Sequence, residues 1–325
     1  MNERLRVAVI GVGHLGQHHA RLFASMNDVD LVGVVDSKPG RAEDVAAKHG
    51  TQACATSGAL LGRVDAVTVA VPTVSHLEVA LPFLERGVAV LVEKPLAATV
   101  ADADRLIDAA ARCGTTLAAG HTERFNPAVV AALPLVSDPR FIEVHRLGTF
   151  PERSLDIDVI FDLMIHDLDL LLAAVHSDVV SVEAVGVNVL TPRTDIANAR
   201  LRFASGCIAN VTASRISRDR VRKIRFFQHD SYVSIDYASQ EVEVYRLVRD
   251  PSTHAPGGLS DEGQKGRPVI QGGKLNVVNE EPLRRELFDF VDAVRTGREP
   301  GVSGRAGRDA LALATRVREK MEANL

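Results

Sequence analysis

The sequence predicts an α/β domain with a doubly wound parallel sheet, followed by an α+β domain with a large, mostly antiparallel sheet. Apolar runs alternate with helical patterns over residues 5–120, as in parallel βαβ units. From about residue 179, apolar runs follow one another at short spacing, which is typical of antiparallel strands. The chain has 325 residues, enough for two domains of about 150 residues each. We expect the domains to cover residues 1–122 and 123–325.

The first half contains buried strands that alternate with helices, each helix with one apolar face. Strands are expected at about 6–10, 31–35, 65–71, 88–92 and 116–120. Helices are expected after residue 13 and at about 41–49, 74–86 and 99–113. Thr99 is the expected N-cap of the last of these helices, and Gly114 follows its end.

The second half changes rhythm after about residue 123. Strands are expected at about 141–150, 179–190, 197–204, 207–214, 221–228, 231–237 and 241–248, and helices at 158–175, 282–296 and 305–323. Ser205-Gly206 is the expected hairpin turn. Residues 250–275 are rich in Gly, Pro, Ser and charge and predict a long mobile loop. The antiparallel sheet needs one face covered, by the 158–175 helix or by a partner subunit.

Composition limits the class of function. The 38 basic and 42 acidic residues give a net charge of −4, so global electrostatics give no reason to expect a nucleic-acid partner. The three cysteines lie far apart, without zinc spacing, which fits a reducing compartment. No apolar stretch approaches the roughly 20 residues of a membrane span, and the first apolar run is too short for a signal peptide. We expect a soluble, cytoplasmic protein without a membrane partner.

A glycine motif follows the first predicted strand. Residues 11–16 read Gly-Val-Gly-His-Leu-Gly and fit G-x-G-x-x-G, which gains specificity because it opens a helix in a βαβ unit. Gly11 allows the tight turn, Gly13 allows the backbone to approach a pyrophosphate, and Gly16 allows close helix–sheet packing. The helix N-terminus then presents N–H groups to the anion. We therefore expect a dinucleotide here, beside His14 and Leu15 of the loop.

Asp36 ends the second strand, 20 residues after Gly16. A carboxylate there accepts hydrogen bonds from ribose hydroxyls and repels a 2′-phosphate, which favours NAD, although nearby Lys38 leaves NADP open. His14 and His18 have the spacing of a helical metal pair, but the glutamate of H-E-x-x-H is absent, so we expect no metal.

Two groups of polar residues follow the third and fourth predicted strands, and a third group lies on a predicted helix of the second half. Pro72, Thr73 and His76 come after the third strong strand, and Glu93-Lys94-Pro95 after the next; ligands bind at such strand ends in open α/β sheets. Asp162 and His166 are four residues apart and share one face of a helix. A carboxylate beside an imidazole suits removal of a proton from an alcohol.

These motifs together resemble the Gfo/Idh/MocA family of nicotinamide-dependent sugar oxidoreductases, which have a Rossmann nucleotide domain. The resemblance covers nearly the whole chain: the loop at 11–16, Glu93-Lys94-Pro95, the Asp162/His166 pair and the tail at 301–304. It implies that Lys94 bonds the reacting hydroxyl between nicotinamide and substrate, and that Lys94–Pro95 is cis. It also implies that His166 is the general base, that Asp162 orients the sugar or the histidine, and that Pro72, Thr73, His76 and Glu93 border the cofactor.

The stretch 121–127, His-Thr-Glu-Arg-Phe-Asn-Pro, resembles members that act on nucleotide sugars, with Arg124 and Asn126 as substrate contacts. The implied substrate is a secondary alcohol of a sugar, with the 3-position of UDP-N-acetylglucosamine as the leading hypothesis. A free sugar or inositol substrate and a non-catalytic NAD-binding sensor remain alternatives. Family members usually pair through the second domain, so we expect a homodimer or homotetramer. A basic stretch from Arg215 to Arg225 is interpreted as a solvated or interface face.

Overall fold

The computed structural model describes residues 4–150, 157–248 and 268–323. The chain forms two compact units, and each is described by itself. The first unit contains residues 1–126, 168–170 and 280–316, and the second contains residues 127–167, 171–279 and 317–325. Residues 280–316 therefore group with the amino-terminal part of the chain, although they come late in the sequence. The division after residue 122 stays a prediction.

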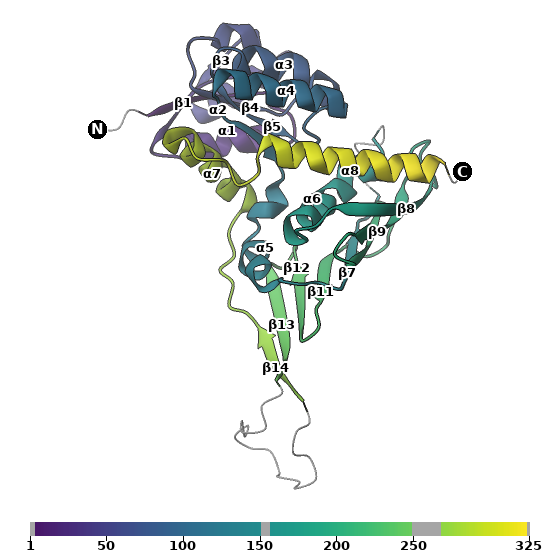
Figure 1. The fold of residues 1–325 in the computed structure, drawn as a ribbon. Helices are drawn as coiled ribbons and strands as arrows, with labels where there is room; N and C mark the ends of the chain where they lie inside the picture. Colours follow the sequence, from purple (N-terminus) through teal and green to yellow (C-terminus); the bar gives the residue numbers. More distant parts are fainter. Residues whose placement is uncertain (1–3, 151–156, 249–267, 324–325) are drawn as a thin grey trace. The chain divides into compact units, whose positions relative to one another are not determined.

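The first unit is built on a parallel sheet with helices between its strands (Figure 1). Its strands are β1 (Leu5–Ile10), β2 (Val29–Val35), β3 (Gln52–Ala53), β4 (Ala66–Val69), β5 (Ala89–Glu93) and β6 (Leu117–Gly120). Its main helices are α1 (Gly16–Ala24), α2 (Arg41–His49), α3 (His76–Leu84), α4 (Val100–Cys113) and α7 (Pro282–Thr296). The strand order is β3-β2-β1-β4-β5-β6 among the described residues, which confirms the predicted doubly wound sheet.

Local signals in the sequence explain these elements. The strands β1, β4 and β5 are mostly apolar because both faces of the sheet are covered; all residues of β4 and β5 are buried. The Thr99 hydroxyl accepts the N–H of Asp102 at 3.1 Å, as expected for the N-cap of α4. Gly114 ends that helix with a φ of +61°, a conformation that costs glycine little.

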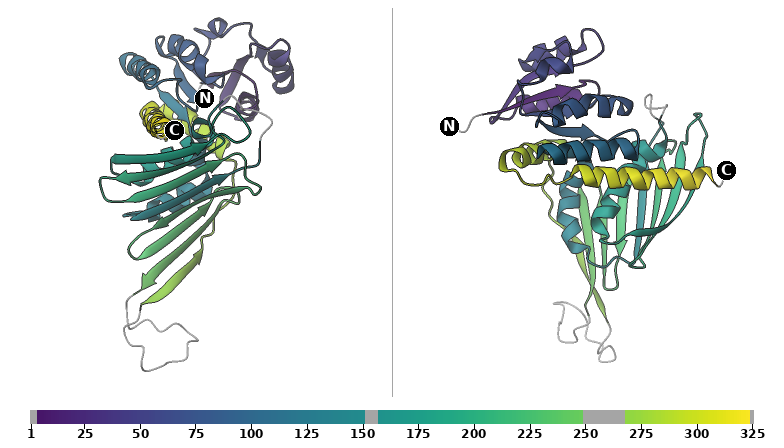
Figure 2. Two further views of the ribbon diagram at one scale, coloured as in Figure 1. Left: turned by 90° about the vertical axis from the view of Figure 1, so that its right-hand side faces the viewer. Right: turned by 45° about the horizontal axis from the view of Figure 1, so that its top comes forward.

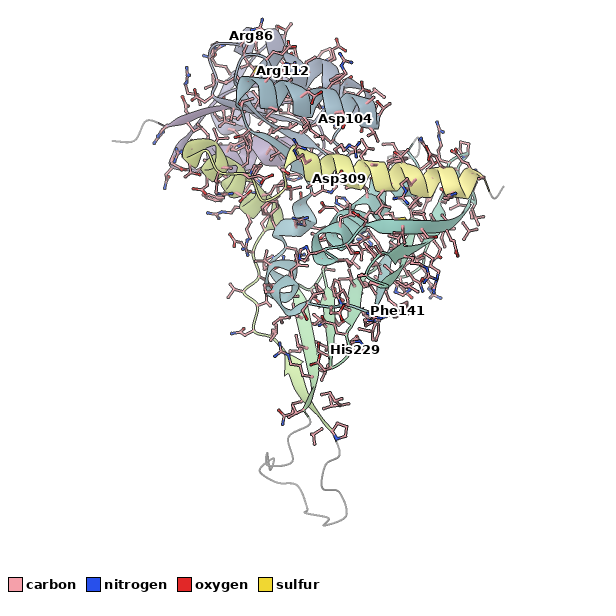
Figure 3. All side chains as sticks on the ribbon, viewed as in Figure 1. Arg86, Asp104, Arg112, Phe141, His229 and Asp309 are labelled. Atoms are coloured by element: carbon pink, nitrogen blue, oxygen red, sulfur yellow. The ribbon has the colours of Figure 1, made fainter. Side chains whose placement is uncertain are left out.

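Helix α7 completes the core of the first unit. Leu287, Phe290 and Val291 belong to the same buried cluster as Phe23 of α1 and Val9 of β1. The short turns of this unit are η1 (Ser57–Leu60), η2 (Thr73–Ser75) and η3 (Thr122–Phe125). Arg308, in the part of α8 (Gly304–Glu322) that belongs to this unit, donates to Asp104 of α4 at 2.9 Å and to its neighbour Asp309 at 3.3 Å. Figure 3 labels both acceptors, Asp104 and Asp309.

The second unit is a broad twisted sheet whose strands lie side by side (Figure 2). Its order is β14-β13-β12-β11-β7-β10-β9-β8 within the described residues. All neighbours are antiparallel except β7 and β10, which are parallel. The strands are β7 (Phe141–Leu147), β8 (Val179–Val187), β9 (Ile196–Phe203), β10 (Ile208–Ser214), β11 (Val221–Phe227), β12 (Ser231–Asp236), β13 (Glu241–Val248) and β14 (Val269–Lys274). This confirms the predicted α+β architecture.

Burial alternates along these strands, so one face of the sheet is covered. In β7 every second residue is buried, from Ile142 to Arg146. The helical elements are α5 (Pro127–Ala132), η4 (Leu133–Leu135), the π-helical turn η5 (Ile160–Met164) and α6 (Ile165–Ala174). The turn η5 packs on β10, and α5 packs on β12 and β13. No helix in the described part of the chain is both long and apolar enough to cross a membrane.

Three sequence predictions need correction. Residues 269–274 form the strand β14, paired with β13, so this part of the predicted 250–275 loop is wrong. Gly272 and Gly273 hide the strand pattern, because strand residues are normally β-branched or aromatic. Residues 250–267 lie outside the described residues. The predicted 158–175 helix instead begins with the π turn η5. The basic stretch from Arg215 to Arg225 is not a solvated face throughout, because Arg215 at its start is buried.

Candidate functional site

The glycine loop of the first unit has no room for side chains at two positions. Gly11 has a φ of +84°, and a Cβ added there would lie 2.6 Å from the Ala70 carbonyl oxygen. A Cβ at Gly16 would lie 1.7 Å from the Gly11 carbonyl oxygen. Both glycines are therefore required by close backbone contacts, as the motif predicts. They bring the first turn of α1 directly against the loop.

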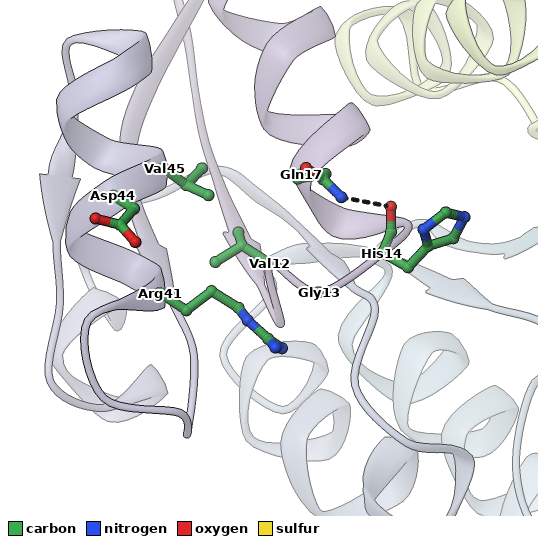
Figure 4. Close-up of a pocket in the computed structure, with 7 residues that line it drawn as sticks. All are labelled: Val12, Gly13, His14, Gln17, Arg41, Asp44 and Val45. Atoms are coloured by element: carbon green, nitrogen blue, oxygen red, sulfur yellow. Dashed lines mark hydrogen bonds between the residues drawn. The ribbon is translucent and has the colours of Figure 1, made fainter. Parts of the chain in front are cut away.

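A cavity of about 400 Å³ lies beside this loop (Figure 4). It is lined by Val12, Gly13, His14, Gln17, Arg41, Asp44 and Val45. A Cβ at Gly13 would lie 3.5 Å from Arg41 Nη1, so Arg41 reaches across toward the loop from the start of α2. Sequence reasoning missed Arg41; its position five residues after Asp36, at the start of a predicted helix, was the available signal.

Asp36 lies at the end of β2, next to the cavity, and its side chain is largely buried. One oxygen accepts the N–H of Val12 at 3.0 Å and the other accepts the N–H of Lys38 at 2.8 Å. Arg41 Nη1 lies 3.7 Å from Asp36 Oδ2. A fixed carboxylate beside a glycine loop and a helix N-terminus is the donor and acceptor set that an adenosine diphosphate needs. The residues present therefore fit a nicotinamide dinucleotide.

The loops after β4 and β5 are joined by His76. Its Nδ1 lies 2.9 Å from the Pro95 carbonyl oxygen and its Nε2 lies 3.0 Å from that of Val71. Burial lowers the pKa of His76, although these carbonyls oppose the shift. The Lys94–Pro95 peptide bond is cis, as the resemblance implied. His76 thus connects the segment of Pro72 and Thr73 to the segment of Lys94.

Glu93 and Glu286 are two buried carboxyl groups of the first unit. Glu93 Oε1 lies 3.1 Å from His19 Nε2, and Oε2 accepts the Lys94 N–H at 3.2 Å. Burial raises the pKa of Glu93, but the bond and charge of His19 and the charge of Lys94 together hold it below its ordinary value. Burial, followed by the charge of Glu93, raises the pKa of Glu286 well above its ordinary value.

Glu286 Oε2 accepts the Thr122 hydroxyl at 2.9 Å, and its Oε1 has no hydrogen-bond partner in the described residues. The surroundings therefore favour the ionised form of Glu93 and the protonated form of Glu286. Glu286 was not singled out in the sequence. A buried glutamate on an otherwise amphipathic helix is indistinguishable there from a surface glutamate.

Lys94 is half-buried at the end of this segment. Two other predicted substrate residues are held within the first unit. Arg124 donates to Asp169 Oδ1 at 3.4 Å and to the Gly301 carbonyl at 3.3 Å. Asn126 is buried and donates to Glu123 at 3.3 Å. Their contact with substrate stays a prediction.

Asp162 and His166 both lie in the second unit and are half-buried. Asp162 is in the π turn η5 and His166 is in the first turn of α6. Single π turns occur often at functional sites. The four-residue spacing of Asp162 and His166 predicted a continuous α-helix. Nothing in the sequence indicated that the first turn would be a wider π turn. Among the described residues, no three His, Cys, Asp or Glu side chains are grouped to hold a metal ion.

Comparison with known proteins gives the family. Residues 5–121 match the model of the oxidoreductase family with an NAD-binding Rossmann fold, and residues 139–230 match the Gfo/Idh/MocA C-terminal domain. The chain is 38% identical to UDP-N-acetylglucosamine 3-dehydrogenase of Acidithiobacillus ferrooxidans, covering 99% of this chain and 98% of that protein. It is 26% identical to myo-inositol 2-dehydrogenase of Thermotoga maritima, covering 98% and 96%.

A solved structure of the A. ferrooxidans enzyme has a TM-score of 0.88 at 37% identity and covers 98% of both chains. The family model describes NAD binding, and the cavity beside Asp36 and the glycine loop fits that cofactor. The similar dehydrogenases act on CH–OH groups of sugars or inositols. This chain belongs to the Gfo/Idh/MocA family of NAD-binding oxidoreductases.

Proposed function

We propose that this enzyme oxidises the 3-hydroxyl of UDP-N-acetylglucosamine with NAD. The observation that carries the proposal is the 38% identity to UDP-N-acetylglucosamine 3-dehydrogenase over 322 residues. Inositol dehydrogenases are similar at lower identity; the Thermotoga maritima enzyme is 26% identical. A free polyol is therefore the competing substrate.

The first unit supplies the cofactor residues in this proposal. Gly11, Gly13 and the N-terminus of α1 hold the pyrophosphate, with His14 and Leu15 beside it. Asp36 accepts the ribose hydroxyls, and its buried carboxylate disfavours the 2′-phosphate of NADP. The loops with Pro72, Thr73 and Glu93 border the nicotinamide end, and His76 fixes their spacing.

Three side chains carry out the chemistry in this proposal. His166 accepts the proton of the substrate hydroxyl, and Asp162 orients the sugar or the imidazole. Lys94 donates a hydrogen bond to the same oxygen and stabilises its developing negative charge. When bound, the nicotinamide supplies the hydride acceptor, or the donor in the reverse direction. Arg124 and Asn126 are proposed to contact the sugar nucleotide.

The test is turnover on a substrate panel. The purified enzyme is given NAD with UDP-N-acetylglucosamine, UDP-glucose, glucose or myo-inositol, and reduced nicotinamide is followed with a ketone trap present. We expect turnover on UDP-N-acetylglucosamine that is lost in Lys94→Ala. Turnover on myo-inositol alone would replace the nucleotide-sugar proposal. NADH binding without turnover of any substrate would favour the non-catalytic sensor.

We also propose that the enzyme is a homodimer or homotetramer formed through the open face of its eight-stranded sheet. A row of rings crosses that face: Phe141, Phe227, Tyr232 and Tyr245 have successive centroid distances of 5.6, 5.1 and 6.2 Å. Rings of this kind are enriched at protein interfaces. A monomeric mass by light scattering at micromolar concentration would remove this proposal.

A further inference from the structure

The segment 157–167 carries both Asp162 and His166, and buried arginines of the second unit hold it at both ends. Its middle is the π turn η5, a conformation that is rare outside single turns. A side chain from α8 also covers it: Arg318 Cζ lies 5.1 Å from the centre of the Phe161 ring. The contacts at its ends therefore decide where these two side chains lie.

The C-terminal end is held by Arg146 of β7. Its Nε donates to Asp167 Oδ2 at 2.7 Å and its Nη2 donates to Oδ1 at 2.9 Å. Both side chains are almost fully buried, and Arg146 Cζ lies 5.2 Å from the centre of the Tyr237 ring. Asp167 directly follows His166, so this fork fixes the turn from which the imidazole projects.

The N-terminal end is held by Arg215, which follows β10. Its Nη1 donates to the Ile157 carbonyl at 2.7 Å, and its Nε donates to Asp195 Oδ1 at 2.9 Å. Asp195 Oδ2 accepts the N–H groups of residues 189–191 at 2.7–2.9 Å. Both side chains of the pair are buried. The loop before β9 and the start of the segment are therefore tied to one ion pair.

A second link joins the same loop to the segment. The Thr194 N–H donates to Asp158 Oδ1 at 3.1 Å, and its carbonyl accepts the Val159 N–H at 3.1 Å. A buried ion pair usually stabilises a core no more than well-packed apolar side chains of similar volume would. Stability alone therefore does not explain why two such pairs lie here. What a forked pair adds is a fixed geometry.

We propose that Arg146–Asp167 and Arg215–Asp195 are positioning pairs that fix Asp162 and His166 for proton transfer, an inference that rests on the proposed function of these two residues. A fold-stabilising role alone predicts that apolar replacement leaves catalysis intact. A positioning role predicts that catalysis falls although the fold persists. The two roles are therefore separable by experiment.

The test replaces the fork with apolar side chains in Arg146→Met/Asp167→Leu. We expect a Tm close to that of the unchanged enzyme, unchanged NADH affinity, and a kcat reduced roughly 10- to 100-fold, the cost of small misplacement of reacting groups. The exposed pair Lys274–Glu241 of the same unit, 2.9 Å apart, gives the control Lys274→Met/Glu241→Leu, which should leave kcat unchanged. A folded Arg146→Met/Asp167→Leu enzyme with kcat within about twofold of the unchanged enzyme overturns the proposal.

If the double variant does not fold, Arg146→Lys tests the proposal instead. It keeps the buried positive charge but cannot make the two parallel hydrogen bonds to Asp167. We expect its kcat to fall while KM changes little; an unchanged kcat overturns the proposal. An NMR readout separates this proposal from the proposed function. The His166 ring ¹H–¹³C signal, assigned with His166→Gln, should move in Arg146→Lys even if no panel substrate is turned over. An unmoved signal overturns positioning independently of substrate.

Discussion

The two units hold their functional side chains by different physical means. In the first unit, backbone geometry does so: Gly11 and Gly16 sit where a Cβ would overlap a carbonyl, and Asp36 is fixed by two backbone N–H groups. In the second unit, buried Arg–Asp pairs hold the segment of Asp162 and His166. A site formed by backbone geometry can be recognised from neighbouring residues in the sequence, whereas a site held by ion pairs depends on residues far apart in the chain.

The units also differ in how they bury charge. Asp167 and Asp195 each have an arginine partner at 2.7–2.9 Å. Glu286 in the first unit accepts the Thr122 hydroxyl at 2.9 Å, and its other carboxyl oxygen has no hydrogen-bond partner among the described residues. Burial and the charge of Glu93 raise its pKa well above the ordinary value. An arginine partner favours the charged form of a buried carboxyl group, whereas burial without a cationic partner favours the neutral form.

The largest expected effect separates chemistry in the second unit from binding in the first. His166→Ala should lower kcat by about 10²- to 10⁴-fold, the usual contribution of a general base. NADH affinity, measured by fluorescence titration, should not change. The exposed His176 of the same unit gives the control His176→Ala, which should keep full activity. Equal losses of kcat in both variants would contradict the assignment of His166.

The converse variant is Gly16→Ala, whose Cβ would lie 1.7 Å from the Gly11 carbonyl oxygen. The backbone must move, so we expect a loss of about 3 kcal/mol or more in unfolding free energy and weakened NADH binding. Gly58→Ala is the matched control, because its nearest neighbour would be Thr56 Oγ1 at 3.8 Å. Wild-type NADH affinity in Gly16→Ala would mean that the loop is not the cofactor site.

A smaller effect tests the buried carboxyl group of Glu286. Burial raises the pKa of Glu286 on folding above its ordinary value of 4.5. The protonated group therefore contributes its full stability below pH 4.5, and this stability is lost as the pH rises through the raised pKa. Glu286→Gln removes the titration, so its Tm should exceed that of the unchanged enzyme increasingly above pH 4.5. Parallel Tm–pH curves for the two proteins would show that Glu286 is not protonated in the fold.

The smallest expected effect concerns a local backbone contact of the first unit. Thr99→Ala removes the acceptor of the Asp102 N–H and should cost about 1 kcal/mol, the usual value of an N-cap. Thr99→Ser keeps the hydroxyl and should restore most of this stability in urea unfolding. A loss in Thr99→Ser as large as that in Thr99→Ala would point to packing of the methyl group instead.

The sequence by itself determined the features that depend on neighbouring residues. Alternating apolar runs predicted both sheets, Thr99 and Gly114 predicted the limits of α4, and the glycine motif with Asp36 predicted the dinucleotide cleft. These signals are local because strand periodicity, caps and glycine turns act within a few residues. The strand β14 was missed for the same reason. Its Gly272-Gly273 pair carries no local strand signal, and the strand is formed by its pairing with β13, which is not visible in the local sequence.

Only the tertiary structure decided the contacts between distant residues. Arg146 and Asp167 are 21 positions apart, His19 and Glu93 are 74 apart, and Thr122 and Glu286 are 164 apart. Composition and periodicity treat such residues as ordinary surface charges. Burial changes their chemistry, because a charge taken out of water must find a partner or lose its charge. Which partner it finds depends on how strands and helices pack.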